Sequence, residues 1–253
     1  MISNRILRYE TLESTNKKAK ECADSLSHMD VIVTKEQTGG RGRMGRQWES
    51  KKGKDLMMTI VLKPKISPKL ISMLTIVMAL AVREALCDLR NDSDNAAHMD
   101  LPMIKWPNDI VISSKKVCGI LTESSLIGDE VKYVIIGCGV NVRSEDFSLS
   151  IENMAGSIKT LWGMDIEPEV VMSKILELFE KYYEAFIRDK GLTNMVSLYN
   201  QSLVSMDKEV IVDEKRGICR GINNQGELLV ERNNKIKCIC AGEVSVRGIY
   251  GYV

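Results

Sequence analysis

Apolar side chains recur at helical spacing in the two longest of the four stretches of this 253-residue chain that are predicted to be helices. The clearest is residues 168–188, which begin with proline, a residue favoured at the first position of a helix. A second long helix is predicted over 68–90, again with a proline near its start. Its most apolar run, 71–82, is much shorter than the roughly 20 residues of a membrane span, so we predict a buried helix. Two further helices are predicted over 14–27, where capping residues come first, and over 194–203.

Runs of β-branched and other apolar residues predict strands between these helices. Two of them, 30–36 and 55–64, flank a loop rich in glycine and arginine. Three more runs, 103–112, 115–126 and 131–142, are separated by turn signals. This arrangement predicts a meander of antiparallel strands.

The pattern changes after about residue 204. From there on, short alternating strands are separated by the turns "NNQGE" and "ERNNK", which is typical of a small β-barrel. We therefore predict an α+β protein with two domains. Residues 1–204 form a mixed β-sheet flanked by helices, and residues 205–253 form a C-terminal β-domain.

The charges of the chain nearly cancel, because 35 Lys and Arg residues stand against 34 Asp and Glu residues, for a net charge of +1. Near-neutrality argues against a protein that coats nucleic acid, since such domains are usually basic overall. Residues 35–54 are the exception, with seven basic and two acidic side chains. A local concentration of positive charge fits a binding site better than a coating surface.

Cysteine and histidine usage narrows the chemistry. Seven cysteines are scattered without a CxxC pair, which predicts free thiols in a reducing cytoplasm, and the N-terminus lacks the apolar core of a secretory signal. Cys238 and Cys240 alone cannot form a zinc site, because two more ligands are needed. His28 and His98 are the two histidines, and neither lies in a motif. We expect no metal site and no histidine relay, so an enzyme with this sequence must rely on positioning and charge stabilisation.

The segment "TGGRGRMGRQW", residues 38–48, combines four glycines with three arginines. Glycines let backbone N–H groups approach an anion closely, and arginines donate paired hydrogen bonds to phosphate or carboxylate. Three interpretations compete: a surface loop held by arginine pairs, an RNA contact, and a loop that closes over a phosphate-bearing ligand. Trp48 alone offers too little aromatic surface for stacking single-stranded nucleic acid.

The segment "KWPND", residues 105–109, interrupts a predicted strand. Pro107 breaks the strand, and Asn108 and Asp109 offer an amide and a carboxylate at the break. One interpretation is a plain hairpin corner. The other is a carboxylate near the basic loop that orients a lysine or holds magnesium on phosphates.

Two glycine-containing segments follow. Lys116 begins the apolar run "KVCGIL", in which Gly119 allows close approach of a ligand, although a lysine at a strand start is often merely solvated. The segment "GCGVN", residues 137–141, lacks the third glycine of a dinucleotide-binding fingerprint. We predict a strand-end turn that carries Asn141.

Taken together, these segments resemble the motif series of the biotin protein ligases. They stand in the order "STN" (14–16), "GRGRMGRQW" (40–48), "KWPND", "KVCGIL" (116–121), "GCGVN" and "AGEVSVRG" (241–248). The resemblance covers nearly the whole chain, and the GRGRxGRxW and KWPND elements are highly specific to that family. It implies a class II synthetase-like catalytic domain followed by a small SH3-like β-barrel.

The resemblance implies a two-step reaction. The biotin carboxylate attacks the α-phosphate of ATP, which gives biotinyl-5′-AMP and pyrophosphate, and an acceptor lysine then attacks the mixed anhydride and releases AMP. Both steps concentrate negative charge, so preorganised cations matter more than a proton relay. Mg²⁺ is expected to be held mainly by the ATP phosphates, with few protein ligands.

By the same resemblance, the motif residues fall into three sets. The residues expected to contact or cover biotin are Ser14, Thr15, Asn16, Gln37, Gly40, Arg41, Gly42, Arg43, Lys116 and Gly119. The residues expected to bind ATP are Arg43, Arg46, Trp48, Asn108, Lys116, Asn141 and Arg247. Three residues are expected to be catalytic: Lys116 bridges the biotin carboxylate and the α-phosphate, Arg43 retains the adenylate, and Asp109 orients the acceptor lysine.

The implied partner is a biotin carboxyl carrier protein or the biotinyl domain of a carboxylase. Ligases that also repress transcription carry a winged helix-turn-helix before the STN segment, which here begins at residue 14, so we expect no DNA binding. We also expect no membrane association, and the exposed strands of the meander allow a homodimer. Two alternatives stay open: a lipoate-type ligase with the same fold and adenylation chemistry, and an RNA-binding module that uses the Gly/Arg loop.

Overall fold

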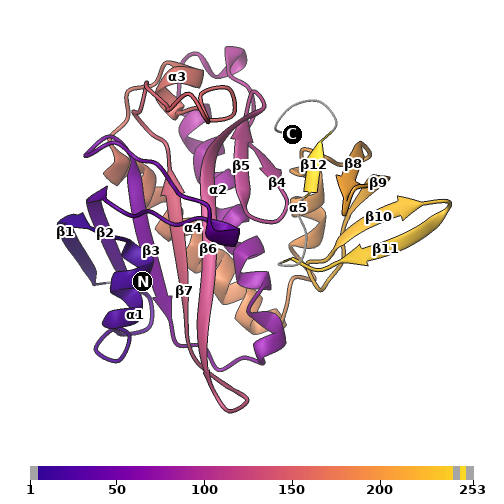
Figure 1. Cartoon of the computed structure of the whole chain (residues 1–253), viewed down its shortest axis with the longest axis horizontal. Coiled ribbons are helices and arrows are strands. Elements are labelled where there is room, and N and C mark those ends of the chain that lie inside the picture. Colours follow the sequence, from indigo (N-terminus) through magenta and orange to yellow (C-terminus); the bar gives the residue numbers. More distant parts are fainter. Residues whose placement is uncertain (1–4, 242–245, 249–253) are drawn as a thin grey trace.

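A seven-stranded mixed sheet is the centre of the larger part of the molecule (Figure 1). The computed structural model describes residues 5–241 and 246–248. The strands are β1 (Ile6–Leu12), β2 (Asp30–Gln37), β3 (Leu56–Leu62), β4 (Met103–Lys105), β5 (Asp109–Ile112), β6 (Lys115–Ile127) and β7 (Glu130–Val140). They lie side by side in the order β1-β2-β3-β7-β6-β5-β4. The β1–β2 pair is parallel, and the other five neighbouring pairs are antiparallel.

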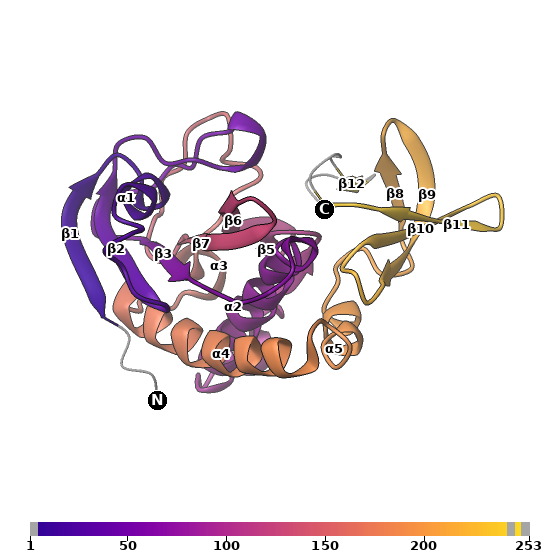
Figure 2. The same ribbon diagram turned by 90° about the horizontal axis from the view of Figure 1, so that it is seen from below.

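Helices cover both faces of this sheet (Figure 2). On one face α1 (Thr15–Glu21) packs over β2, β3 and β7. On the other face lie the two long helices α2 (Met73–Asn91) and α4 (Pro168–Asp189), which pack against each other. Because β3 is covered on both sides, all seven of its residues are buried, and its sequence is a continuous apolar run.

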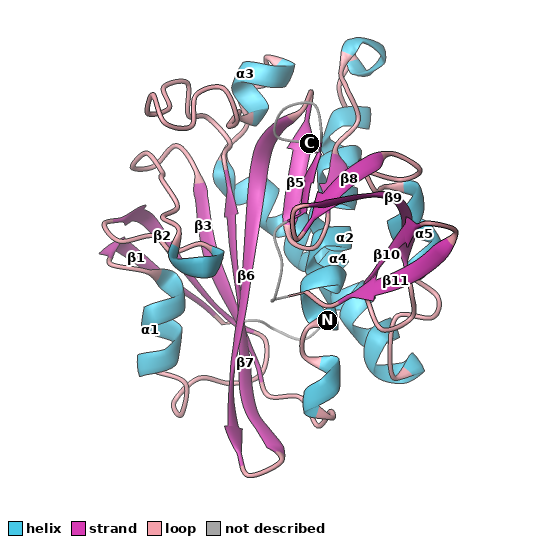
Figure 3. Ribbon diagram, turned by 45° about the vertical axis from the view of Figure 1, so that its right-hand side comes forward, coloured by secondary structure: helices cyan, strands magenta, loops and turns pink. Residues whose placement is uncertain are grey.

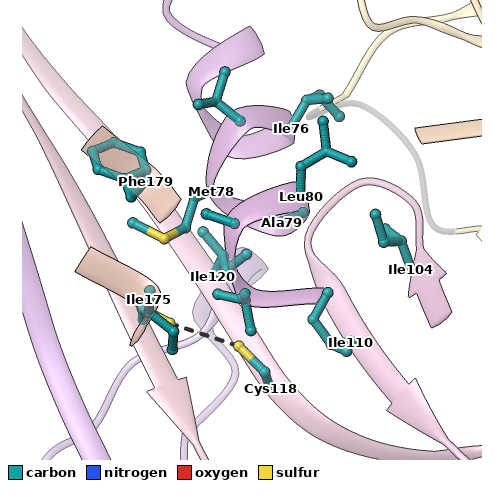
Figure 4. Packing of buried hydrophobic residues seen from close by; sticks show 14 of the residues in the cluster. Ile76, Met78, Ala79, Leu80, Ile104, Ile110, Cys118, Ile120, Ile175 and Phe179 are labelled. Carbon is teal, nitrogen blue, oxygen red and sulfur yellow. Dashed lines mark hydrogen bonds between the residues drawn. The ribbon is translucent and has the colours of Figure 1, made fainter. Parts of the chain in front are cut away.

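The hydrophobic core lies between the sheet and the pair α2 and α4. Figure 4 shows Met78 of α2 near Ile120 of β6 and near Ile175 and Phe179 of α4, with Leu80 on the side of α2 away from Phe179. All five side chains are almost fully removed from water. Burial of this kind stabilises a fold by about 1.5–3 kcal/mol for each large apolar side chain.

The helical segment Pro68–Asn91, which includes the 3₁₀ turn η2 (Pro68–Leu70), is long and apolar enough to cross a membrane by length and composition alone. Most of its most apolar stretch is buried inside the protein, against the sheet and α4. The predicted buried helix is therefore confirmed. The whole helical segment is longer than the apolar run 71–82, which was the part compared with the length of a membrane span.

The shorter helical elements connect these layers. They are α3 (Ile158–Trp162), α5 (Val196–Gln201) and the 3₁₀ turns η1 (Arg43–Gly45) and η3 (Ala96–His98). The turn η1 lies inside the Gly/Arg loop and stands in front of β6 in the view of Figure 1.

A second, smaller sheet follows α5 and lies beside the first (Figure 3). Its strands are β8 (Glu209–Val212), β9 (Lys215–Ile222), β10 (Leu228–Arg232), β11 (Lys235–Ile239) and β12 (Val246–Gly248). They are all antiparallel, in the order β11-β10-β9-β8-β12. The two sheets are tied together at the "KWPND" hairpin, where the buried indole Nε1 of Trp106 donates to the carbonyl oxygen of Gly226 at 3.0 Å.

The structure confirms the predicted α+β class, the meander β4–β7 and the run of short strands after residue 204. The predictions differ from the structure near the N-terminal end of the chain and after β7. The helix expected over 14–27 ends at Glu21, and the edge strand β1 and the helix α3 were not predicted.

Candidate active site

One cavity gathers most of the residues that the sequence motifs singled out. It lies between the N-terminus of α1, the loop 38–48 and strands β6 and β7, and encloses about 460 Å³ including its open mouth. The predicted residues in its lining are Ser14, Thr15, Asn16, Gln37, Arg41, Gly42, Arg43, Trp48, Asn108, Lys116 and Gly119. Motifs far apart in the sequence thus meet around one space.

The N-terminus of α1 forms the polar end of the cavity. Ser14 caps the helix, and its side chain accepts from the backbone N–H of Lys17. Gln37, the last residue of β2, accepts from the backbone N–H of Thr15 at 2.8 Å and from the Thr15 hydroxyl at 3.1 Å. Both bonds use the carboxamide oxygen of Gln37, so its NH₂ group is the donor that it contributes to the cavity.

Asn16 is held by three hydrogen bonds beside this group. Its Oδ1 accepts from the Thr59 hydroxyl at 2.6 Å, and its Nδ2 donates to the Leu121 carbonyl at 3.2 Å and to Glu123 Oε2 at 2.9 Å. The other oxygen of Glu123 pairs with Lys20 on α1. The network joins α1 to β3 and β6 across the sheet.

The Gly/Arg loop folds as a small hairpin at the cavity. Arg41 and Gln47 form a β-bridge, and the N–H of Trp48 donates to Gly40 O at 3.0 Å. A Cβ on Gly40 would lie 2.5 Å from the carbonyl oxygen of Trp48, so this closure requires glycine. The basic loop is therefore folded at the cavity, with Arg41, Gly42, Arg43 and Trp48 in its lining.

Arg43 points from this loop to the "KWPND" hairpin. Its Nη1 donates to Asn108 Oδ1 at 2.8 Å, and Asn108 in turn donates to the Ile120 carbonyl of β6 at 3.0 Å. Partial burial lowers the pKa of the Arg43 guanidinium, while the nearby Asp109 carboxylate opposes this shift. The guanidinium stays charged, because an arginine pKa lies far above neutral pH.

Lys116 places a second cation at the cavity. Its Nζ lies 2.7 Å from Asp109 Oδ1 and 5.4 Å from the centre of the Trp48 ring. The Trp48 ring itself packs against two strands that lack side chains at the contact. A Cβ on Gly119 or on Gly139 would come within 2.9 Å or 2.6 Å of the ring. Within the described part of the chain, the buried indole N–H of Trp48 has no hydrogen-bond partner.

Some predicted residues lie outside this lining. Asp109 pairs with Lys116, Gly40 is hydrogen-bonded to Trp48 within the loop, and Arg46 is exposed on the loop. Asn141 is buried and donates to the Gly156 carbonyl at 3.0 Å, away from the cavity. For Arg247 the backbone pairs with Ile211 in the small sheet, and its side chain lies outside the described residues.

The prediction of a strand-end turn for "GCGVN" is wrong. Gly137 and Gly139 lie inside β7, and Asn141 directly follows the strand. A Cβ on Gly137 would lie 2.2 Å from Asn16 Oδ1, so the glycines serve the close approach of α1 and Trp48 to the sheet. A glycine pair inside an apolar strand run is the sequence signal that could have shown this.

Two acidic residues that hold the surroundings of the cavity in place were not found from the sequence motifs. Glu123 holds Asn16, and the buried carboxylate of Asp55 accepts from the backbone N–H groups of Lys51 and Val142 at 3.0 Å each. Asp55 thereby joins the end of the segment after the Gly/Arg loop to the end of β7. Neither acid lies in a recognisable motif, and no local signal in the sequence marks its partner.

Within residues 5–241 and 246–248, no three or more His, Cys, Asp and Glu side chains lie together in a group that could hold a metal ion. The cavity therefore offers cations, amide groups and hydroxyls to a ligand, in a space bounded by two strands and a closed loop. This chemistry fits a ligand with an anionic part near Lys116 and Arg43 and a small polar part near the N-terminus of α1.

Comparisons with known proteins agree with this arrangement. Residues 9–141 match the family model described as the biotin/lipoate A/B protein ligase family. The chain is 32% identical to the bifunctional ligase/repressor BirA of Bacillus subtilis, over 97% of this chain and 75% of that protein. It is 30% identical to the biotin--[acetyl-CoA-carboxylase] ligase of Paracoccus denitrificans, over 93% of this chain and 98% of that protein. Among solved structures, the biotin protein ligase of Aquifex aeolicus in complex with biotin and ATP superposes with a TM-score of 0.83 at 27% identity, covering 96% of this chain and 99% of that chain.

Proposed function

This chain belongs to the biotin/lipoate A/B protein ligase family, and we propose on that premise that it is a biotin protein ligase. The observation that carries the proposal is one cavity with Lys116 and Arg43 at one side and the hydroxyl and amide groups of α1 and β2 at the other. Biotin has the matching parts, a carboxylate at the end of an apolar chain and a ureido ring rich in donors and acceptors.

The first step joins biotin to AMP. A carboxylate oxygen of biotin attacks the α-phosphorus of ATP, and the bond to the bridging oxygen breaks, so pyrophosphate leaves. The Lys116 ammonium stabilises the negative charge shared by the carboxylate and the α-phosphate. The 2.7 Å ion pair with Asp109 holds the ammonium in place before the substrates bind.

The second step transfers the biotinyl group. The ε-amine of the acceptor lysine attacks the acyl carbon, the bond from that carbon to the phosphate oxygen breaks so that AMP leaves, and the nitrogen loses a proton to water. We propose that Asp109 orients this amine, and that Arg43 keeps the adenylate in the closed site through its bond to Asn108. The acceptor is a biotin carboxyl carrier protein or a carboxylase biotinyl domain, in keeping with the name of the Paracoccus denitrificans relative, a biotin--[acetyl-CoA-carboxylase] ligase.

The residues proposed at biotin are those at the polar end and the loop: Ser14, Thr15, Asn16, Gln37, Gly40, Arg41, Gly42, Arg43, Lys116 and Gly119. The residues proposed at ATP are Arg43, Arg46, Trp48, Asn108, Lys116, Asn141 and Arg247. The buried indole N–H of Trp48, which has no hydrogen-bond partner among the described residues, supports this proposal because it is a donor that a bound ligand would satisfy. Mg²⁺ is proposed to bind through the ATP phosphates, where it neutralises their charge.

Several coarser features are part of the proposal. We place the domain boundary between residues 204 and 205. Val204 still belongs to the first domain, because its backbone N–H donates to the carbonyl oxygen of Ile104 in β4. A cytoplasmic location is supported by thiols that are not in disulfides at positions such as Cys118 and Cys238. The homodimer and the expected lack of DNA binding stay predictions, for which sedimentation and mobility-shift measurements are the tests.

The test of the function is biotin-dependent exchange of labelled pyrophosphate into ATP, with lipoate in place of biotin as the matched control. We expect exchange with biotin and Mg²⁺ and little with lipoate. Preferential exchange with lipoate would support the lipoate-type ligase instead. No exchange with either acid, together with RNA binding that falls steeply with salt, would support the RNA-binding module.

A further inference from the structure

We propose that Glu123 is a positioning residue that fixes Asn16 as a hydrogen-bond acceptor for a ring N–H of the substrate, and that this selects a cyclic urea over a dithiolane. The inference rests on the proposed function, because it concerns how the same cavity recognises one end of biotin. Glu123 lies on β6, two residues after Leu121 of the cavity lining, and belongs to none of the sequence motifs.

The hydrogen bonds of Asn16 leave one site for a ligand. A carboxamide has two N–H donors and two acceptor lone pairs. Both donors are used, by the Leu121 carbonyl and by Glu123 Oε2. One lone pair of Oδ1 accepts from the Thr59 hydroxyl. The second lone pair of Oδ1 is what remains, so Asn16 offers the cavity an acceptor and no donor.

Glu123 and Leu121 also determine which way the carboxamide faces. If the group were turned over, its oxygen would face a carbonyl and a carboxylate, which both accept and cannot donate. The Thr59 hydroxyl can donate or accept and expresses no preference. The charge of Glu123 makes the wrong orientation especially unfavourable in a site shielded from water, where Asn16 is 5% exposed.

The surroundings keep the carboxamide in this place. Lys20 of α1 pairs with Glu123 Oε1 and leaves Oε2 for Asn16. On the opposite side the oxygen lies against the backbone of β7 at Gly137, where a Cβ would come within 2.2 Å of it. An acceptor fixed on both sides cannot adapt to a ligand that lacks a donor.

This acceptor explains discrimination between the two cofactors of the family. The ureido ring of biotin has two N–H donors, whereas the dithiolane ring of lipoate has none. A site built to bond an N–H rejects an analogue without it strongly, because the buried acceptor is left unpaired. Glu123 therefore sets the selectivity of the cavity without touching the substrate.

The test measures pyrophosphate exchange by Glu123→Ala with biotin, with lipoate and with the two biotins methylated at one or the other ureido nitrogen. We expect the KM for biotin to rise about 10- to 100-fold, which is the effect of losing one hydrogen bond to a charged group. We expect kcat to stay within about twofold of the wild-type value. Wild type is expected to reject the isomer whose methylated nitrogen faces Asn16, and Glu123→Ala is expected to lose this distinction. Glu123→Gln is expected to restore most of the affinity, because its side-chain oxygen accepts the same bond.

The matched control is Glu130→Ala, which removes an exposed acid at the start of the neighbouring strand β7 and is expected to behave as wild type. An unchanged KM in Glu123→Ala would overturn the proposal. A raised KM with the isomer preference intact, or one that Glu123→Gln does not restore, would also overturn it and make Glu123 a structural residue. Failure of wild type to exchange with biotin would instead refute the proposed function.

Discussion

Replacing Gly137 by alanine perturbs the contact between α1 and the sheet at a single atom. The new Cβ would lie 2.2 Å from Asn16 Oδ1 and 2.9 Å from Asn16 Cγ, far inside van der Waals contact. Gly137 cannot retreat, because it is paired on both sides, with Thr59 of β3 and with Leu121 of β6. Asn16 must therefore move, although three hydrogen bonds hold it.

The cost of Gly137→Ala follows from these two constraints. Overpacking a buried site costs about 1–3 kcal/mol. Loss of the Thr59–Asn16 hydrogen bond adds about 1 kcal/mol. We expect a decrease of about 2–4 kcal/mol in the free energy of unfolding, and weaker binding of biotin, because the displaced carboxamide no longer lines the cavity.

The assay is a double-mutant cycle with Asn16→Ala, measured by urea unfolding and by calorimetry with biotin. On the Asn16→Ala background the Cβ meets no carboxamide, so Gly137→Ala is expected to cost less than about 0.5 kcal/mol there. Ser124→Ala, a substitution farther along β6, is the control for general effects on the sheet. Additive costs in the two backgrounds, or a cost of Gly137→Ala as small as that of the control, would refute the reasoning.

Three further predictions concern the cations of the site and one histidine. Lys116→Ala is expected to lower biotin-dependent pyrophosphate exchange about 10²- to 10³-fold with the circular dichroism spectrum unchanged, and normal exchange would remove Lys116 from the first step. Arg43→Gly is expected to release biotinyl-AMP, which would be seen as labelling of bystander proteins. Asn108→Ala removes the hydrogen-bond partner of the Arg43 guanidinium and is expected to cause weaker release. Labelling confined to the acceptor protein in both variants would exclude a role of Arg43 in retaining the adenylate. Burial lowers the pKa of His28, whose Nδ1 accepts from the Lys63 N–H at 3.0 Å, so its contribution to stability is present above the unfolded pKa of about 6.5 and is lost as the pH falls below it. His28→Asn is expected to flatten the loss of stability as the pH falls below about 6.5 in urea titrations, and an unchanged acid limb would contradict this assignment.

The sequence predicted the long elements because their signals are local. The helix α4 has its proline at the start and an apolar stripe, and β3 is apolar throughout because helices cover both of its faces. The edge strand β1 was missed because its burial is partial and irregular, so its alternation is weak. Helix α1 ends at Glu21 although helix formers continue past it, since the chain turns there through Cys22.

Site residues could be predicted where the residue types of a local motif indicate its chemistry. They were missed where a residue acts through a hydrogen-bond partner that is remote in the sequence. The arginines and glycines of the loop 38–48 favour a loop that closes over a phosphate-bearing ligand, although a surface loop and an RNA contact use the same residue types. Glu123 reads as one acid among many, because its partner Asn16 lies 107 positions away and meets it only through the register of the sheet. The glycines of β7 were assigned to a turn, since close approach by another element leaves the same sequence signal as a turn.

The bond between Trp106 and Gly226 has a consequence for chimaeric enzymes. The acceptor is a main-chain carbonyl, so the contact requires the path of the β9–β10 turn and no particular side chain. Gly226 has a φ of +75°, a backbone conformation that favours glycine. When the small sheet is exchanged, the geometry of this turn is therefore what must be kept. A small sheet from a related ligase should therefore graft onto this chain if its turn keeps a glycine there, however far the remaining sequence has diverged. Deleting the small sheet would leave a buried indole without an acceptor in the very hairpin that supplies Asn108 and Asp109.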